Sequence, residues 1–140
     1  MNRQDLKDYR YNQKWIDGRL AYLEEYQTRL TKITSILSDM PRASSPVEDK
    51  FAENLAILLD NMNLLMQKIT EESNKQKEIL KKLEEIEQPY RLILEKVYIQ
   101  GETLVEVASE MNYDYKYLCR QHGIALNLFD EKDRKVDKSS

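Results

Sequence analysis

The sequence predicts an all-α protein, with a long antiparallel helical hairpin followed by a C-terminal helix–turn–helix. Of its 140 residues, 41% are hydrophobic and 34% are charged, and Gly and Pro occur only three times each. This composition is typical of long helices with a solvated face. Apolar residues also recur at steps of three and four along two long stretches, which indicates a coiled-coil-like seam. Pro41 and Pro46 separate the two stretches.

Charge and cysteine content narrow the class of protein. The formal charge of −3 argues against a strongly basic nucleic-acid binder, although phosphate contacts depend on local patches. The single cysteine, Cys119, allows neither an internal disulfide nor a cysteine-based zinc site, and it favours the cytoplasm. The first residues have no apolar signal-peptide core, and no run approaches about 18 consecutive apolar residues. We therefore expect neither secretion nor membrane spanning.

The first long helix is expected between residues 4 and 40, most clearly from Tyr9 onward. Its stripe is narrow, as in a helix that packs against one partner. Gln27 and Thr34 interrupt the stripe, and the neighbouring Tyr26 and Ile33 cover these gaps. The apolar residues of the stripe are Tyr9, Ile16, Leu20, Leu23, Leu30 and Leu37.

The second long helix is expected to begin at Pro46. Ser45 and Glu48 have the spacing of a capping box around a proline at the first helical position. Glu72 and Gln76 are the only polar residues at its seam; they mark the end of a shorter partner helix, or they fix the register between subunits. The apolar seam consists of Phe51, Leu55, Leu58, Met62, Leu65, Ile69, Ile79, Leu83 and Ile86.

Residues 1–88 are therefore predicted to form the hairpin, because a short loop between two long helices makes them antiparallel neighbours. We favour a homodimer through these long helices over a hairpin alone. The large core residues are few, with two Phe and one Trp, so that self-association would help to bury the apolar stripes.

Residues 89–129 are predicted to form three short helices. Pro89 opens the first, and Gly101 ends it. Thr103 and Glu106 have capping-box spacing at the start of the second. The apolar faces of these two helices consist of Tyr90, Ile93, Leu94 and Val97, and of Leu104, Val107, Ala108 and Met111.

The third short helix follows the turn at residues 111–114. Asp114 is expected to cap it, with Tyr113 and Leu118 placed for a hydrophobic staple. The helix is expected to end near Phe129. Residues 130–140 are charged and poor in apolar side chains, so we expect them to be disordered.

Residues 101–126, GETLVEVASEMNYDYKYLCRQHGIAL, resemble the region-four helix–turn–helix of bacterial sigma factors. IQG (residues 99–101) and HGIAL (residues 122–126) are similar to phage-encoded late transcription regulators of the ArpU and RinA type, which are small proteins from phages of Gram-positive bacteria. The specific resemblance covers about residues 89–129. The residues that carry the resemblance are Leu104, Val107 and Ala108, the turn at Asn112 and Tyr113, and Leu118, Ala125 and Leu126.

The resemblance implies a transcription regulator in the cytoplasm of a bacterial host, with the third helix in the major groove of double-stranded DNA. It places Asp114, Tyr115, Lys116, Cys119 and Arg120 toward the bases. Among these, Lys116 and Arg120 have the chemistry to contact guanine edges or phosphates, and Tyr115 to contact a sugar or a phosphate. The resemblance assigns the His122–Gly123 pair to helix packing.

The sequence departs from the family in ways that weaken DNA binding by one copy. Asp114, Tyr115 and Tyr117 replace the usual basic or small polar residues, and Gln121 stands where an aliphatic residue is common. Between residues 89 and 140, eight Lys or Arg oppose nine Asp or Glu. We therefore expect weak binding by a monomer, which two modules on a dimer would strengthen.

No catalytic, cofactor or metal site is expected. Cys119 lacks an obvious activating neighbour, and a single histidine, His122, cannot form a multi-histidine metal site. Phosphate-cradle, hydrolase and zinc-protease motifs are absent from the sequence. The alternative functions are an adaptor that contacts RNA polymerase or another host protein with little DNA binding, and a phage-encoded inhibitor that docks through the coiled coil.

Overall fold

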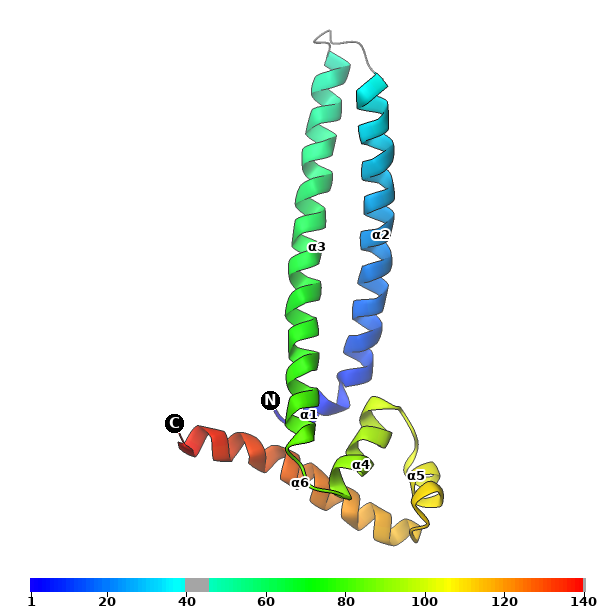
Figure 1. The fold of residues 1–140 in the computed structure, drawn as a ribbon, viewed down its shortest axis with the longest axis vertical. Helices are drawn as coiled ribbons and strands as arrows, with labels where there is room; N and C mark the ends of the chain where they lie inside the picture. The colour runs from blue at the N-terminus through cyan, green and yellow to red at the C-terminus, as the bar shows by residue number, and fades with distance from the viewer. Residues whose placement is uncertain (40–45, 140) are drawn as a thin grey trace. The chain divides into compact units, whose positions relative to one another are not determined.

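The computed structural model describes residues 1–39 and 46–139, without the side chains of residues 46–48 and 133–139. The secondary structure within these ranges is entirely helical, which confirms the predicted fold class. The helices are α1 (Arg3–Lys7), α2 (Tyr9–Asp39), α3 (Pro46–Glu84), α4 (Tyr90–Leu94), the π-helix η1 (Glu95–Ile99), α5 (Leu104–Met111) and α6 (Tyr115–Ser139) (Figure 1).

The chain forms two compact units. Residues 15–73 form one unit, which we call the hairpin unit. Residues 1–14 and the chain from residue 74 onward form the other, the helix–turn–helix unit. The boundary that the sequence analysis places between residues 88 and 89 lies inside the second unit.

In the hairpin unit, α2 and α3 run side by side in opposite directions (Figure 1). The most buried apolar side chains occupy the predicted seam. Leu20 is an exception: 46% of it is exposed, so its predicted place in the seam is wrong. Arg19 is half-buried instead, because a long aliphatic stem can pack while its charged end stays in solvent. The buried seam residues of this unit are Ile16, Leu58, Met62 and Ile69.

The first helix does not run unbroken from residue 4. α1 ends at Lys7, and α2 begins at Tyr9. The Asn2 side chain accepts a hydrogen bond from the Gln4 N–H at 2.9 Å, and the Asp5 carboxylate accepts one from the Asn2 N–H at 2.8 Å. These reciprocal bonds form a capping box at the start of α1.

α3 begins at Pro46, as predicted, whereas Ser45 and the Glu48 side chain lie outside the described residues. Further along α3, Gln76 is 5% exposed. Its Nε2 donates to the Tyr9 carbonyl oxygen at 3.0 Å and to the Gln13 Oε1 at 3.4 Å. The first turns of α2 therefore still accompany α3 at Gln76, and the partner helix does not end there.

The helix–turn–helix unit has two hydrophobic clusters. α4 contributes to both, with Leu94 in the first and Ile93 in the second. The second cluster unites α4 with α5 and α6, and its other buried members are Val107, Ala108 and Leu118. The first cluster unites the chain's first residues with the end of α3 and with α6, and its other buried members are Leu6, Tyr9, Ile79, Leu83, Ile86, Ala125, Leu126 and Phe129.

α6 continues to Ser139, so the predicted helix end near Phe129 is wrong, and the expected disordered segment is helical as far as residue 139. One physical reason is a contact with the N-terminus. Arg3 Nε lies 2.6 Å from Asp130 Oδ2, and the Arg3 backbone N–H donates to Asp130 Oδ1 at 2.9 Å. This contact joins residues 127 positions apart, which no local pattern reveals.

Candidate nucleic-acid interface

The helix–turn–helix begins at the Thr103 cap of α5. The Thr103 hydroxyl oxygen accepts a hydrogen bond from the Glu106 N–H at 3.2 Å, as predicted. The Glu106 carboxylate, however, accepts from the Thr103 hydroxyl at 3.2 Å and not from the Thr103 backbone N–H. The cap therefore forms, but the second bond of the predicted capping box is replaced by a bond between side chains.

The turn between α5 and α6 is held by local hydrogen bonds. Asn112 has a φ of 57° in the left-handed region. The Tyr113 N–H donates to the Ala108 carbonyl oxygen at 2.9 Å, and the Asn112 N–H donates to that of Ser109 at 3.3 Å. This is the Schellman pattern that ends a helix. The Asp114 carboxylate then accepts from the Lys116 N–H at 3.2 Å, which confirms Asp114 as the cap of α6.

Tyr113 packs against the second cluster, where Leu118 is fully buried, in agreement with the predicted staple. The Tyr113 and Tyr117 rings meet edge to face, with centroids 5.2 Å apart and planes at 85°. Because this side of α6 is buried, the side chains on the opposite side of the helix face solvent.

The structure places Lys116 and Arg120 together, but not Tyr115. Lys116 and Arg120 are both exposed and lie four residues apart, so they share one face of α6. The Arg120 guanidinium lies 5.9 Å from the centroid of the Tyr117 ring. Tyr115 is 49% exposed, but at about 100° per residue it lies roughly 140° around the helix from Arg120.

Asp114 and Cys119 also have other roles than contact with bases. Asp114 is occupied as the helix cap. Cys119 is half-buried, and its hydrogen bond with the Tyr115 side chain raises the pKa of that phenol. Among the predicted base-facing residues, Lys116 and Arg120 are therefore the pair best placed to contact DNA.

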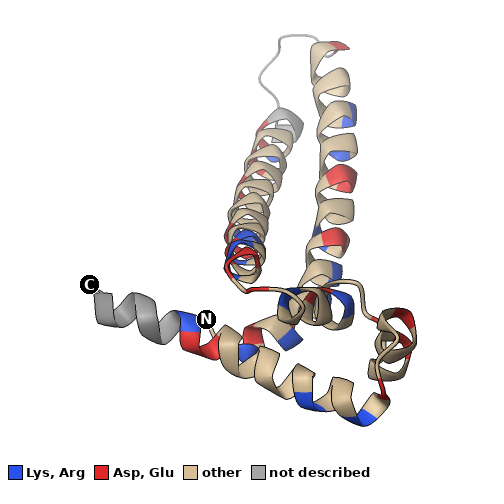
Figure 2. Ribbon diagram, turned by 60° about the horizontal axis from the view of Figure 1, so that its bottom comes forward, with Lys and Arg blue, Asp and Glu red and all other residues tan. Residues whose placement is uncertain are grey.

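The charges of this module are segregated between its helices. Residues 115–129 of α6 include Lys116 and Arg120 and no carboxylate, whereas α5 carries Glu106 and Glu110 and no cation. Figure 2 shows the acidic residues on α5 and the basic residues on the first half of α6. The near-neutral total therefore conceals one helix with a positive face, which matters for phosphate binding because electrostatic attraction acts locally.

An ion-pair cluster compensates part of the acidic charge beside α5. Lys96 Nζ lies 2.6 Å from Glu110 Oε2 and 3.8 Å from Glu102 Oε2. The hydrogen bond to Glu110 raises the pKa of Lys96 and lowers the pKa of Glu110. Burial, followed by the proximity of Glu110, raises the pKa of Glu102. The cluster thus reduces the negative field next to the candidate DNA-binding face.

One residue near this face was missed by the sequence analysis. Arg3 Nη2 donates to Asn127 Oδ1 at 2.7 Å, and Asn127 lies seven residues after Arg120, on the same side of α6. Arg3 therefore approaches this side of the helix, with its charge paired to Asp130. Arg3 precedes Asn127 by 124 residues, so no sequence spacing signals the contact.

The same module also exposes apolar side chains. Val105 on α5 is 65% exposed, and Tyr117 and Ile124 on α6 are each 42% exposed. Tyr117 and Ile124 are seven residues apart and lie along one side of α6. Exposed apolar side chains in a row are typical of protein–protein contact, so this surface is relevant to the adaptor alternative.

Among the side chains that the structure describes, no three His, Cys, Asp or Glu are grouped so as to hold a metal ion. None of the helices within residues 1–39 and 46–139 is both long and apolar enough to cross a bilayer. Comparison of the chain with protein-family models, curated proteins and solved structures finds no match.

Proposed function

We propose that this protein is a phage or prophage transcription regulator. It binds double-stranded DNA by placing α6 in the major groove, and it acts in the cytoplasm of a bacterial cell as a homodimer, without catalysis. The family assignment rests on the resemblance of residues 101–126 to sigma region four. The DNA-binding role rests on the chemistry of α6.

The observation that carries the proposal is the uninterrupted positive face of α6. Lys116 and Arg120 share an exposed face, and no carboxylate occurs between residues 115 and 129. Arginine suits bidentate contact with guanine, and lysine suits contact with guanine edges or phosphates. The Asp114 cap holds the first turn of α6 in place, so the two cations stand on a rigid element.

The test is the affinity of the protein for duplex fragments from the region upstream of its own gene. We expect the double variant Lys116→Ala/Arg120→Ala to bind at least about tenfold more weakly, because each base or phosphate contact contributes roughly 1 kcal/mol or more. The matched control is Lys77→Ala/Lys81→Ala, which removes two exposed cations four residues apart on α3. Equal affinity of wild type and the α6 variant would refute the assignment to this face.

A second function is favoured by the exposed Val105, Tyr117 and Ile124: an adaptor that contacts RNA polymerase or another host protein. The two functions differ in retention on DNA cellulose at low salt. A DNA reader is retained and elutes as salt rises, because phosphate contacts release counterions. An adaptor passes through the column, and its Val105→Glu variant loses binding to purified polymerase while Lys116→Ala/Arg120→Ala keeps it.

A further inference from the structure

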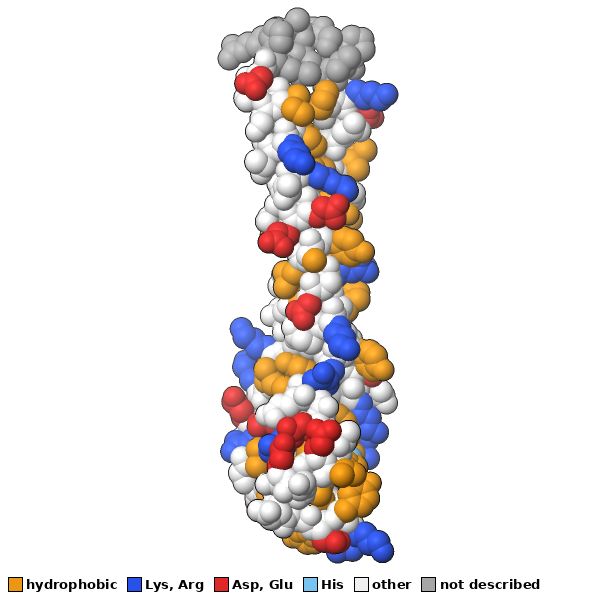
Figure 3. Space-filling model, turned by 90° about the vertical axis from the view of Figure 1, so that its right-hand side faces the viewer, with side chains coloured by type: hydrophobic (Ala, Val, Ile, Leu, Met, Phe, Trp, Pro, Cys, Tyr) orange, Lys and Arg blue, Asp and Glu red, His pale blue; other side chains and the backbone are white. Residues whose placement is uncertain are grey.

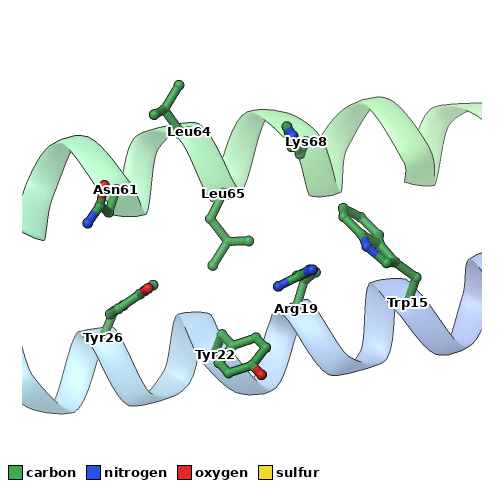
Figure 4. A pocket seen from close by; sticks show the side chains of 8 residues that line it. All are labelled: Trp15, Arg19, Tyr22, Tyr26, Asn61, Leu64, Leu65 and Lys68. Atoms are coloured by element: carbon green, nitrogen blue, oxygen red, sulfur yellow. The ribbon is translucent and has the colours of Figure 1, made fainter.

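A groove in the hairpin unit combines aromatic rings with two cations, Arg19 and Lys68. Its volume is about 560 Å³, and it lies between α2 and α3 (Figure 4). Figure 4 shows that Leu65 points from α3 toward α2, whereas Leu64 points away. The residues that line the groove are Trp15, Arg19, Tyr22, Tyr26, Asn61, Leu64, Leu65 and Lys68.

On the α2 side of the groove, aromatic rings alternate with arginines. The Arg19 guanidinium lies between two rings, 5.2 Å from the centroid of Trp15 and 5.4 Å from that of Tyr22. Arg29 continues the pattern, 5.8 Å from the ring of Tyr26. Steps of four and three residues place all five side chains on one side of α2. Stacking fixes the plane of a guanidinium. Arg29 Nη2 donates to Glu25 Oε1 at 2.8 Å, so Arg19, which lines the groove, is the arginine left to bind an acceptor.

The charges of the groove have one sign. Arg19 and Lys68 form no ion pair with a carboxylate among the described residues, and none of the eight lining residues is acidic. On α2, Asp17 and Glu24 lie roughly 160° and 140° around the helix from Arg19 by the ideal helical repeat. The groove is therefore a positive, aromatic surface on a protein whose formal charge is −3.

The rings remain accessible. Tyr22 is 51% exposed, and Trp15 and Tyr26 are half-buried. Figure 3 shows hydrophobic side chains, mixed with charged ones, along the surface of the long helices. What separates the groove from those scattered side chains is the regular alternation of rings and cations around one hollow.

We propose that this groove binds single-stranded nucleic acid. Its phosphates pair with the N–H edge of Arg19 and with the Lys68 ammonium, and its bases stack on the exposed faces of Tyr22 and Trp15. Proteins that bind single strands without sequence preference use this combination of a positive groove and aromatic platforms. The site is separate from the α6 face proposed for double-stranded DNA, and it does not depend on that proposal.

The experiment measures fluorescence anisotropy of a labelled oligothymidine of about twenty nucleotides, longer than the roughly 4 to 16 nucleotides that single-strand sites cover, with the full chain at low salt. We expect Arg19→Glu/Lys68→Glu to weaken binding at least about tenfold, and Tyr22→Ala to weaken it less, since one stacked base contributes roughly 1 to 3 kcal/mol. Lys77→Glu/Lys81→Glu, which reverses two exposed lysines of α3, is the charge-matched control. Lys77 lies nine residues after Lys68, so it faces the opposite side of α3.

Three results would overturn the proposal. The first is no binding of oligothymidine by the wild type, and the second is equal binding by wild type and Arg19→Glu/Lys68→Glu. The third is displacement of the oligonucleotide by polyglutamate at an equal concentration of charge, which would identify the groove as a docking site for acidic protein segments. Circular dichroism establishes that each variant keeps the hairpin.

The Lys116→Ala/Arg120→Ala variant separates this site from the α6 face. We expect it to keep oligothymidine binding while it loses duplex binding. If that variant instead loses oligothymidine binding and Arg19→Glu/Lys68→Glu keeps it, single strands bind at α6 and the groove is not their site. A failure of duplex binding alone leaves the groove result intact.

Discussion

At the scale of single residues, His122 illustrates how the packing of the helix–turn–helix unit determines a protonation state. Its Nε2 lies 2.7 Å from the Tyr98 hydroxyl, and the two rings stack with centroids 5.7 Å apart. Burial, and then the positive charges of Lys7 and Arg3, lower the pKa of His122 below its ordinary value of 6.5. The folded protein therefore favours the neutral ring.

This shift predicts the sign of a pH effect on stability. Below about pH 6.5 the unfolded chain takes up a proton at His122 that the folded chain resists. The free energy of unfolding therefore falls as the pH drops below 6.5, until the folded ring is protonated as well. In urea denaturation at about pH 7.5 and about pH 5.5, we expect wild type to lose more stability than His122→Gln. An equal loss in both proteins would show that His122 does not contribute.

At the scale of helices, the contact between α1 and α6 extends the helix–turn–helix unit. Arg3 makes a charge-assisted bond to Asp130 and a further bond to Asn127. The Arg3 and Asp130 side chains are 38% and 28% exposed, so solvent weakens the pair. We expect Arg3→Ala to lower the free energy of unfolding by about 1 kcal/mol.

A double-mutant cycle with Asp130→Ala isolates this interaction from other effects of each substitution. We expect the double variant to be less destabilised than the sum of the two single variants. Additive effects, measured by urea denaturation, would mean that the pair contributes nothing. Lys7→Ala is a suitable control, since it removes another exposed cation of α1.

The helices themselves were largely predictable because their signals are local. Pro46 at the start of α3, the Thr103 and Asp114 caps and the Tyr113–Leu118 staple all depend on residues within a few positions of each other. The regular apolar steps of α3 likewise predicted its buried side chains, including Leu58 and Met62.

The errors have physical causes that hydrophobic periodicity cannot detect. Leu20 was placed in the seam because it is apolar, but it is exposed, and the half-buried Arg19 beside it lies between the rings of Trp15 and Tyr22. A cation that gains from stacking on aromatic rings counts as polar in any periodicity search. The extension of α6 beyond Phe129 likewise involves Arg3, which is remote in sequence.

The candidate site was predictable in part. Spacing alone gives Lys116 and Arg120 a common helix face, and the structure exposes both. Tyr115 was carried over from the family resemblance, although its spacing of four residues from Cys119 and five from Arg120 already places it on the side of Cys119. The count of charged residues in the sequence also made this module look nearly neutral, because a total charge does not show which helix carries the acidic residues and which the basic ones.

At the scale of the whole molecule, the hairpin unit has a surface that is a candidate interface for the proposed dimer. Apolar residues occur on several sides of α3 between residues 55 and 66, not only at the seam. Leu59 and Met66 are 41% and 48% exposed and lie seven residues apart, on one side of the helix. A helix that is apolar on more than one side is usually buried by a partner.

This second apolar side is distinct from the groove. Leu64 and Met66 are two residues apart and therefore about 200° apart around α3. The side that includes Leu59 and Met66 has no charged residue across nearly twenty positions of α3, which suits contact with an identical surface on a second copy. Its members are Ala52, Ala56, Leu59, Asn63, Met66 and Thr70.

We therefore predict that this apolar side of α3 forms the dimer interface. In Leu59→Glu/Met66→Glu, two carboxylates on each copy would meet across the interface, so light scattering should give the mass of a monomer where wild type gives that of a dimer. Duplex binding should weaken by about a hundredfold or more, because two linked helix–turn–helix modules bind at a high effective concentration. Gln67→Glu/Asn74→Glu, which adds the same charges on a neighbouring side of α3, should remain dimeric. A monomeric wild type at micromolar concentration would contradict the dimer and leave α6 to bind DNA as a single, weak module.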